Sequence, residues 1–471
     1  MPENDLFGMT ATQSAGQARV PYVDQRVLMG SDIRRNAVPS QSYNAADGVR
    51  FFHPATRKGF GMTLGQLSKH LLLLGGIGSG KTNVFNLMLH QLLGSMNQND
   101  VMLIFDTKGD FARKFYNPQN PCHILIGNGR AYRRYTSHWN VFQEILENQV
   151  PMADIELSAR EIAAQLFRDR GSETQPFFAS AATDLVAKVI IDFVRTYYRT
   201  RDASRLHNAE LVAFFRSAGI KEYSAVLQKP ENLDFRSAQM YIGDPDEPMN
   251  GQALGVFGEI NSMVSDLFTG IFADGRDGLR EVSMRRIVRE KGRRVVFIEY
   301  DLSLGEVLGP IYRLLIDLAL KEALGRATGE REPGSVYLVV DEFKLLPNLL
   351  HIDDALNFGR SLGVKVMAGL QSIQQLYDIY GESRGKSIAA GFMNSFCFQT
   401  WDTESRKYIS ERFGRNYSAV TYRIEGEPIR VQKDGFAVED WDILKLGVGE
   451  AFVNMVGYEP FIYQFPEYNR G

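Results

Sequence analysis

A glycine-rich stretch near residue 75 has the residue types and spacing of a phosphate-binding loop. Residues 75–82 read G-G-I-G-S-G-K-T and match the pattern G-x-x-x-x-G-K-T. Glycines lack a Cβ, so backbone N–H groups in such a loop close around phosphate oxygens. The lysine would reach the β- and γ-phosphates of ATP, and the threonine hydroxyl would bind Mg²⁺. The residues expected to contact the nucleotide are Gly75, Gly76, Ile77, Gly78, Ser79, Gly80, Lys81, Thr82 and Asn83.

Two adjacent carboxylates follow a later apolar run. The segment V-Y-L-V-V at residues 336–340 is succeeded by Asp341 and Glu342. In P-loop hydrolases the first carboxylate holds Mg²⁺ and the second polarises the attacking water. Asp341 is therefore predicted to be a metal ligand together with Thr82, and Lys81 and Glu342 are predicted to be catalytic. Apolar-apolar-Asp-Glu also occurs at ordinary strand ends, but the complete loop upstream favours catalysis.

Two more polar segments follow apolar runs. Gln371 ends the run at residues 364–370, where an amide could sense the γ-phosphate or orient water, so it is a further predicted catalytic residue. The sequence Asp106-Thr-Lys-Gly-Asp110 follows the run at residues 101–105. Its carboxylates and Lys108 would share the edge with the loop. A solvated turn explains the same residues equally well.

The runs that carry these residues are short and continuous, as buried parallel strands are, and helical patterns lie between most of them. We therefore predict an α/β fold with a mostly parallel sheet and nucleotide at the carboxyl ends of its strands. The predicted strands cover residues 71–74, 101–105, 123–126, 294–300, 336–340, 364–370, 396–399 and 450–454.

The order of these patterns divides the chain into three parts. Residues 51–150 and 286–471 are predicted to form the nucleotide-binding domain. Residues 151–285 show helical periodicity without a clear strand signal, which predicts an inserted all-α domain. Residues 1–50 are rich in Ser, Gln, Asn, Ala and Gly and are predicted to be a flexible arm with one short helix around Val23 to Arg34.

Composition places the chain among ordinary globular proteins. It has 471 residues, 44% apolar and 23% charged, and a net charge of −3, so any contact with DNA must come from a local basic surface. Its two cysteines, Cys122 and Cys397, are far apart and do not indicate a disulfide framework. No apolar run approaches the ~18 residues of a membrane span. These features predict a soluble, intracellular protein.

The ordered set of motifs resembles the ATPases of the type IV secretion coupling protein family, which feed DNA into conjugation machinery. The resemblance covers about residues 60 to 460 and includes the glycine-rich loop preceded by His70. The other matching segments are residues 105–110, Trp139-Asn140, Phe177-Phe178 with the alanine-rich helix after it, and residues 341–347, 358–364, 369–381 and 402–414.

This resemblance implies a RecA-like ATPase that assembles into a homo-oligomeric ring such as a hexamer, although it could be a monomer in isolation. DNA would pass through the pore and ATP would bind between subunits. Arg360 matches the position from which the family inserts an arginine finger into the adjacent subunit's site, where a guanidinium neutralises developing charge. An ordinary helix-surface arginine is the alternative.

The resemblance also implies the partners: DNA bound without sequence specificity, a relaxase or other secretion substrate, and membrane-embedded secretion components. Family members usually carry an N-terminal membrane anchor, and this sequence contains no such segment. Either the chain is trimmed, or it is a cytoplasmic member that a partner recruits to the inner membrane.

Two functions remain open on the sequence. The first is an ATP-driven DNA translocase, and the second is an adaptor whose helical insert binds relaxase or effector proteins, with nucleotide serving assembly. Two basic clusters could bind DNA phosphates or simply face solvent. These clusters are Arg130, Arg133 and Arg134 with Tyr132 and Tyr135, and Arg285, Arg286, Arg289, Lys291, Arg293 and Arg294.

Overall fold

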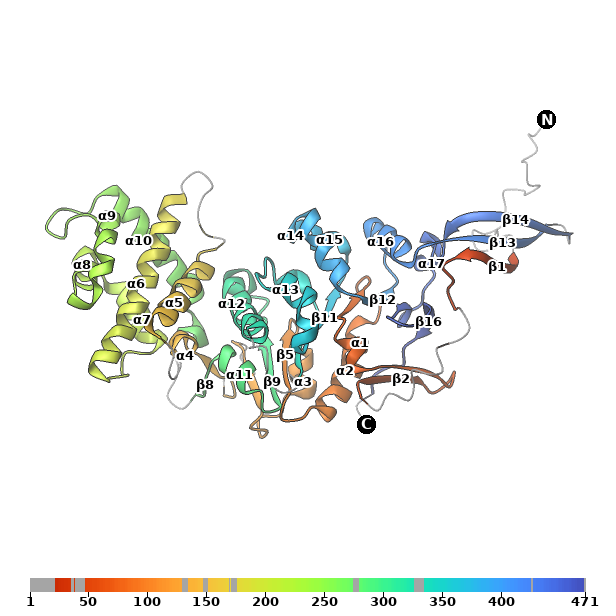
Figure 1. The fold of residues 1–471 in the computed structure, drawn as a ribbon, viewed down its shortest axis with the longest axis horizontal. Helices are drawn as coiled ribbons and strands as arrows, with labels where there is room; N and C mark the ends of the chain where they lie inside the picture. The colour runs from red at the N-terminus through yellow and green to blue at the C-terminus, as the bar shows by residue number, and fades with distance from the viewer. Residues whose placement is uncertain are drawn as a thin grey trace, which may run out of the picture.

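A nine-stranded sheet forms the middle of the molecule, with a group of helices at one end and a three-stranded sheet at the other (Figure 1). The computed structural model describes residues 22–34, 38, 47–128, 134–146, 151–168, 170, 176–273, 279–325, 334–424 and 427–469. All structural statements below concern these residues.

The nine strands of this sheet have the order β16-β15-β12-β4-β11-β10-β5-β9-β6. Neighbours from β12 to β6 pair in parallel, whereas β15 and β16 pair antiparallel at one edge. The predicted α/β fold with a mostly parallel sheet is confirmed. The strands are β4 (Leu71–Leu74), β5 (Val101–Asp106), β6 (His123–Ile126), β9 (Arg294–Glu299), β10 (Val336–Val340), β11 (Val364–Leu370), β12 (Asn394–Phe398), β15 (Glu450–Asn454) and β16 (Phe461–Gln464).

Helices cover both faces of this sheet, which explains why its strands are apolar at every position. In β4, Leu71 and Leu73 belong to one hydrophobic core, whereas Leu72 and Leu74 belong to the other. Alternate residues of a strand point to opposite faces, so each strand supplies both cores. One face carries α2 (Lys81–Ser95) and α3 (Asp110–Phe115), and the other carries α12 (Gly305–Leu324), α13 (Ile352–Asn357), α14 (Ile373–Tyr380), α15 (Glu382–Gly391) and α16 (Thr403–Phe413).

The helical insert lies between α4 (Val141–Ile145) and α11 (Met284–Glu290), as the helical periodicity predicts. Its entry and exit strands, β7 (His138–Trp139) and β8 (Glu281–Val282), pair side by side. The buried carboxylate of Glu144 joins them, because it accepts hydrogen bonds from Trp139 Nε1 (2.9 Å) and Ser283 Oγ (2.7 Å). The helices of the insert are α5 (Met152–Leu166), α6 (Pro176–Thr200), α7 (Asn208–Ser217), α8 (Ile220–Leu227), α9 (Gln239–Ile242) and α10 (Gly251–Leu267).

The N-terminal helix predicted around Val23 to Arg34 is wrong. Tyr22–Gly30 forms the strand β1, which pairs antiparallel with β13 (Arg415–Ile424), and β13 pairs with β14 (Glu427–Phe436). A strand partner so distant in sequence leaves no local signal, and tertiary pairing overrides a weak helical pattern. Residues 1–21, 35–37 and 39–46 of the predicted arm lie outside the described residues.

Several short elements also escaped the sequence analysis. A hairpin of β2 (Val49–His53) and β3 (Lys58–Met62), followed by α1 (Leu64–Leu67), precedes the glycine-rich loop, and α17 (Asp440–Leu444) follows β14. Both cysteines are free, as predicted. Within the described ranges, no helix combines the length and the apolar character that crossing a membrane requires.

Candidate active site

The glycine-rich loop joins β4 to α2 at the carboxyl edge of the sheet. Its backbone is anchored from the next strand, because the N–H of Gly76 donates to the carbonyl of Gln399 (2.8 Å). Gly80 has a φ of 110°, and a Cβ at this position would lie 2.9 Å from the Cα of Gly449. Only glycine satisfies both conditions. Since α2 begins immediately after Gly80, the positive end of the helix dipole lies at the loop.

Lys81 places its ammonium group inside this loop. The side chain is buried, and Nζ donates hydrogen bonds to the carbonyl oxygens of Gly75 and Gly76, the second at 3.0 Å. Burial lowers the pKa of Lys81, and the negative charges of Glu342 and Asp341 oppose this change. The ammonium group is therefore positioned where it can bind an anion in the loop.

Thr82 and Asp341 meet although 259 residues separate them. Thr82 Oγ1 donates to Oδ2 of Asp341 at 3.0 Å. Burial raises the pKa of Asp341, whereas the Thr82 hydroxyl and Lys81 lower it. Hydroxyl and carboxylate oxygens are ligands that Mg²⁺ prefers, and they fit this ion. Among the described residues no three His, Cys, Asp or Glu side chains form a metal cluster, so phosphate and water oxygens would complete the coordination.

Glu342 and Gln371 form a second pair at the same edge. Gln371 Nε2 donates to Oε2 of Glu342, while Oε1 of Glu342 is buried without a partner among the described residues. Burial raises the pKa of Glu342, and the hydrogen bond from Gln371 opposes this rise. A buried carboxylate oxygen that lacks a protein donor is suited to accept a hydrogen bond from water or substrate.

The segment from Asp106 to Asp110 has two different roles in the structure. The Asp106 carboxylate accepts hydrogen bonds from the backbone N–H groups of Ala112 (2.7 Å) and Asp110 (3.1 Å), so it holds the turn that begins α3. Lys108 is exposed, and its positive charge lowers the pKa of both Lys81 and Asp341. Asp106 is therefore structural, whereas Lys108 adds its charge to the site.

Arg360 does not join this group within one chain. It is exposed and lies in the short helical segment Gly359–Leu362, just before the amino end of β11. The glycine-rich loop lies beyond the carboxyl end of that strand. Seven extended residues span about 20 Å, so Arg360 cannot reach Lys81 of its own chain.

The side chain of Asn83 bonds to the backbone of its own chain. Its Nδ2 donates to the carbonyl of Pro466 (2.8 Å), and its Oδ1 accepts from the N–H of Tyr468 (2.7 Å). The amide group thus attaches the C-terminal segment to α2, because a side chain on the first turn of this helix can reach the segment that follows β16. Contact with nucleotide would fall to the backbone of Asn83.

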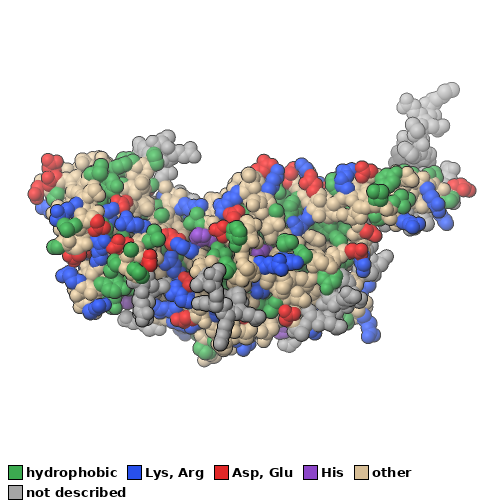
Figure 2. Space-filling view, viewed as in Figure 1, with side chains coloured by type: hydrophobic (Ala, Val, Ile, Leu, Met, Phe, Trp, Pro, Cys, Tyr) green, Lys and Arg blue, Asp and Glu red, His purple; other side chains and the backbone are tan. Residues whose placement is uncertain are grey.

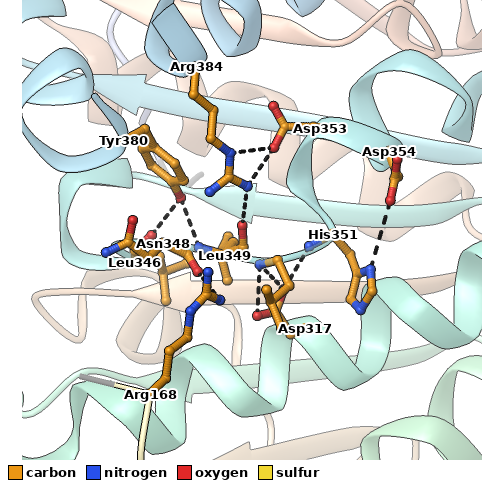
Figure 3. Close-up of polar contacts among 11 residues, drawn as sticks. Arg168, Asp317, Leu346, Asn348, Leu349, His351, Asp353, Asp354, Tyr380 and Arg384 are labelled. Carbon is orange, nitrogen blue, oxygen red and sulfur yellow. Dashed lines mark hydrogen bonds and ion pairs between the residues drawn. The ribbon is translucent and has the colours of Figure 1, made fainter. Parts of the chain in front are cut away.

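Asp317 of α12 is a buried acid that the sequence analysis missed. It holds residues 346–351, which we call the post-Glu342 segment (Figure 3). Its carboxylate accepts hydrogen bonds from the N–H groups of Leu350 (2.9 Å) and His351 (3.2 Å). Burial raises the pKa of Asp317, and these N–H groups oppose the rise. A lone acid within the apolar run L-L-I-D-L-A-L at residues 314–320 was the available signal.

Other side chains, among them Tyr380, Arg168 and Arg384, also hold the post-Glu342 segment (Figure 3). The hydroxyl of Tyr380 accepts from the N–H of Leu349 (3.3 Å) and donates to the carbonyl of Leu346 (2.8 Å). Arg168, just after α5, donates to the carbonyl of Asn348 (2.8 Å). The helical insert therefore contacts the backbone that follows Glu342.

The second basic cluster makes mostly internal contacts. Arg285 is buried and pairs with Glu161 (3.0 Å), and Arg289 pairs with Glu322 (2.8 Å). Positive and negative side chains are interspersed over the face shown in Figure 2. These contacts favour a structural role for this cluster. In the first cluster, Arg134 and Tyr135 are exposed, and Arg130, Tyr132 and Arg133 lie outside the described residues.

The chain is similar in sequence to known proteins. Residues 58–419 match the family model described as "Type IV secretion-system coupling protein DNA-binding domain". Coupling protein TraD of Escherichia coli (strain K12) is 21% identical over 322 residues, which are 68% of this chain and 40% of TraD. VirD4 of Bartonella quintana (strain Toulouse) is 23% identical over 323 residues, 64% of this chain and 47% of VirD4. The chain therefore spans less than half the length of these relatives.

Solved structures of TrwB share the fold. The unbound bacterial conjugative coupling protein TrwBdeltaN70 superposes with a TM-score of 0.71 at 19% identity, covering 96% of this chain and 97% of that chain. Plasmid coupling protein TrwB in complex with ADP and Mg²⁺ gives 0.67 at 19% identity, covering 96% and 97%. These structures establish a RecA-like fold with a helical insert. Because the family model matches most of its length, the chain belongs to the type IV secretion-system coupling protein family.

Proposed function

We propose that the chain is an ATP-hydrolysing coupling protein that moves DNA or a nucleoprotein substrate in a conjugative or type IV secretion system. The convergence of two bonded pairs on the glycine-rich loop carries this proposal: Thr82 with Asp341, and Glu342 with Gln371. A related structure supports it, since TrwB has been solved in complex with ADP and Mg²⁺. The description of the family model as a DNA-binding domain supports the choice of substrate.

Each residue of the site has a defined task in this proposal. Lys81 binds the β- and γ-phosphate oxygens, and Thr82 and Asp341 would hold Mg²⁺, which when bound neutralises phosphate charge. Glu342 orients the attacking water and accepts its proton. Gln371 holds the Glu342 carboxylate in place. A raised pKa suits Glu342 for this role, because a stronger base takes a proton more readily.

Arg360 would complete the site from a neighbouring subunit. Its position away from its own loop supports an action in trans, in which its guanidinium neutralises charge on the transferred phosphoryl group. We propose that the protein works as a ring, such as a hexamer, around DNA. In this arrangement residues 51–150 and 286–471 form the motor domain, and residues 151–285 receive a relaxase or another secretion substrate close to membrane-embedded components.

The test is ATPase activity measured against protein concentration, with and without DNA. A site completed in trans requires specific activity to rise with assembly, and DNA is expected to increase it further. Lys81→Ala should abolish turnover, because the phosphates lose their buried ammonium partner, whereas Lys221→Ala on the exposed surface of α8 should not. If the wild-type protein hydrolyses no ATP at high concentration with DNA, the proposal is wrong.

A second candidate function is an adaptor that binds protein substrates. Exposed apolar side chains on the insert favour it: Phe177 is 42% exposed, Met240 69% and Leu254 58%. Such side chains often mark protein contacts. Substrate capture and transfer that both survive Lys81→Ala would favour the adaptor, whereas capture with loss of transfer would favour the motor.

A further inference from the structure

The most exposed large apolar side chains of the described residues surround the glycine-rich loop. Ile77 is 86% exposed, Trp401 74% and Val448 73%, more than any other large apolar side chain described. Ile77 lies in the loop itself. We call these three side chains the apolar rim. Exposure of this size at one place costs hydrophobic free energy and indicates a surface that a ligand or partner covers.

Backbone hydrogen bonds join the segments of the apolar rim to the loop. The carbonyl of Gln399, two residues before Trp401, accepts the N–H of Gly76 (2.8 Å). The N–H of Gly449, next to Val448, donates to the carbonyl of Ser79 (2.9 Å). The rim therefore belongs to the same rigid unit as the phosphate-binding backbone.

Strand order determines which end of a nucleotide faces this rim. The sheet runs β12-β4-β11-β10, so the carboxylates that follow β10 lie on one side of the loop that follows β4. Trp401 follows β12 and lies on the other side. Val448 lies there as well, because β15 runs antiparallel to β12 and Phe398 pairs with Ala451. If the γ-phosphate is directed toward Asp341, the nucleoside at the other end of the triphosphate is directed toward the apolar rim.

We propose that Trp401, with Val448 and Ile77, forms the platform on which the base of the bound nucleotide stacks. The inference deepens the proposed ATPase function and rests on it. An indole offers a flat π-face, and stacking of a base on an aromatic side chain tolerates different bases because each base has such a face.

The polar groups next to the platform are already engaged. Gln399 Nε2 donates to the carbonyl of Leu444 (2.8 Å), and Gln464 Nε2 donates to the carbonyl of Val448 (3.0 Å). Each bond uses an N–H of the side-chain amide, which leaves fewer groups available to read the edge of a base. The platform should therefore bind ATP and GTP with similar affinity and bind pyrimidine nucleotides, whose rings are smaller, more weakly.

The main experiment separates the base from the phosphates. The full chain is titrated by calorimetry with a non-hydrolysable ATP analogue and with inorganic tripolyphosphate, each with Mg²⁺. Trp401→Ala should lower the affinity for the analogue about tenfold and should change the affinity for tripolyphosphate by less than about twofold. Trp401→Phe keeps an aromatic face and should restore most of the affinity. Trp441→Ala removes the other exposed tryptophan, which is 50% exposed, and should leave the affinity for both ligands unchanged.

Tryptophan fluorescence supplies an independent measurement. Trp139 is fully buried, so among the three tryptophans of the chain only Trp401 and Trp441 are exposed to a ligand. The ATP analogue should quench the tryptophan fluorescence of the wild type and of Trp441→Phe, but not that of Trp401→Phe. Tripolyphosphate has no base and should not quench any of them.

The outcomes distinguish this inference from the proposed function. If wild type and Trp401→Ala bind the analogue with equal affinity, the platform proposal is wrong and the phosphate site is unaffected. The platform proposal is also wrong if Trp401→Ala loses affinity for the analogue and for tripolyphosphate to the same extent. A defect that appears only at concentrations where subunits assemble would assign Trp401 to a subunit contact instead. If the wild type binds neither ligand, both proposals are wrong.

Discussion

The hydroxyl of Thr82 donates a 3.0 Å hydrogen bond to the carboxylate of Asp341, across 259 residues of sequence. Thr82 lies in the first turn of α2, after β4, and Asp341 directly follows β10, with β11 between the two strands. Their contact shows that the glycine-rich loop and the paired carboxylates occupy one edge of the sheet.

Replacement of Glu342 by glutamine should separate binding from hydrolysis. The amide cannot accept the proton of the attacking water, so turnover should fall by about 10²-fold or more, while nucleotide affinity changes little. Glu342→Asp moves the carboxylate but keeps the base and should retain more activity. Calorimetric affinity and steady-state turnover measure the two effects. Full activity of Glu342→Gln would remove Glu342 from its proposed role.

Replacement of Asp341 by asparagine should stabilise the protein at neutral and alkaline pH while it abolishes Mg²⁺-dependent activity. Burial raises the pKa of Asp341 above its ordinary value of 3.8, so its ionised form destabilises the fold. This cost is absent below the unfolded-state pKa and appears as pH rises through the folded-state pKa. The gain for Asp341→Asn should be on the order of 1 kcal/mol at about pH 8 and smaller at pH 3.8, the ordinary pKa of the group.

Urea unfolding of both proteins at the two pH values measures this difference. The neighbouring Lys81 and Lys108 stabilise the carboxylate and limit the gain, and Asp110 acts in the opposite sense. An asparagine oxygen can still accept the Thr82 hydrogen bond, so the packing should persist. A loss of stability at about pH 8 would contradict the assignment of a desolvation cost to Asp341.

Arg360→Ala should lose ATP turnover, and mixing this variant with a second inactive variant should restore part of it. The variant retains its own loop and carboxylates, so it should bind nucleotide normally and lose about 10³-fold in activity. In a mixture with Glu342→Gln, some interfaces combine an intact loop and Glu342 from one subunit with Arg360 from the other. Activity of the mixture above the sum of the two variants would support action in trans. Arg216→Ala, at an exposed position of α7, is the control.

Lys108→Ala should weaken binding of a triphosphate more than of a diphosphate. The charge of Lys108 acts on Lys81 and Asp341, on the side of the loop where the γ-phosphate would lie. Loss of one exposed charge near the ligand corresponds to about 1 kcal/mol, or roughly fivefold in affinity. Lys108→Arg keeps the charge and should restore binding. If wild type and Lys108→Ala bind both ligands with equal affinity, Lys108 is an ordinary residue of a solvated turn and does not contribute to the site.

Asp317→Ala should destabilise the fold and impair turnover together. It leaves the partly buried N–H groups of Leu350 and His351 without their acceptor, which costs about 2–4 kcal/mol. The post-Glu342 segment would also lose its anchor, so turnover should fall. Asp317→Asn keeps an acceptor oxygen and should lose less. Urea unfolding and ATPase assays measure both effects, and an alanine variant as stable as wild type would contradict the anchoring role.

Sequence patterns located the sheet well because its strands are buried on both faces. Continuous apolar runs such as Leu71–Leu74 and Val336–Val340 have few alternative structures, and their boundaries match the prediction. The strand β1 was missed because its partner β13 lies at the other end of the chain. A weak local pattern carries no information about such a partner.

The residue types of the candidate site came from the sequence: a glycine-rich loop, Lys81, two carboxylates and Gln371. Their grouping depended on tertiary structure, since Thr82 reaches Asp341 only after β4, β11 and β10 pair in order. Tertiary contacts also decided that Asp106 holds a turn, that the Asn83 amide binds the C-terminal segment, and that Trp401 lies beside the loop. Spacing along one chain encodes local motifs, whereas the partner of a side chain depends on which strands become neighbours.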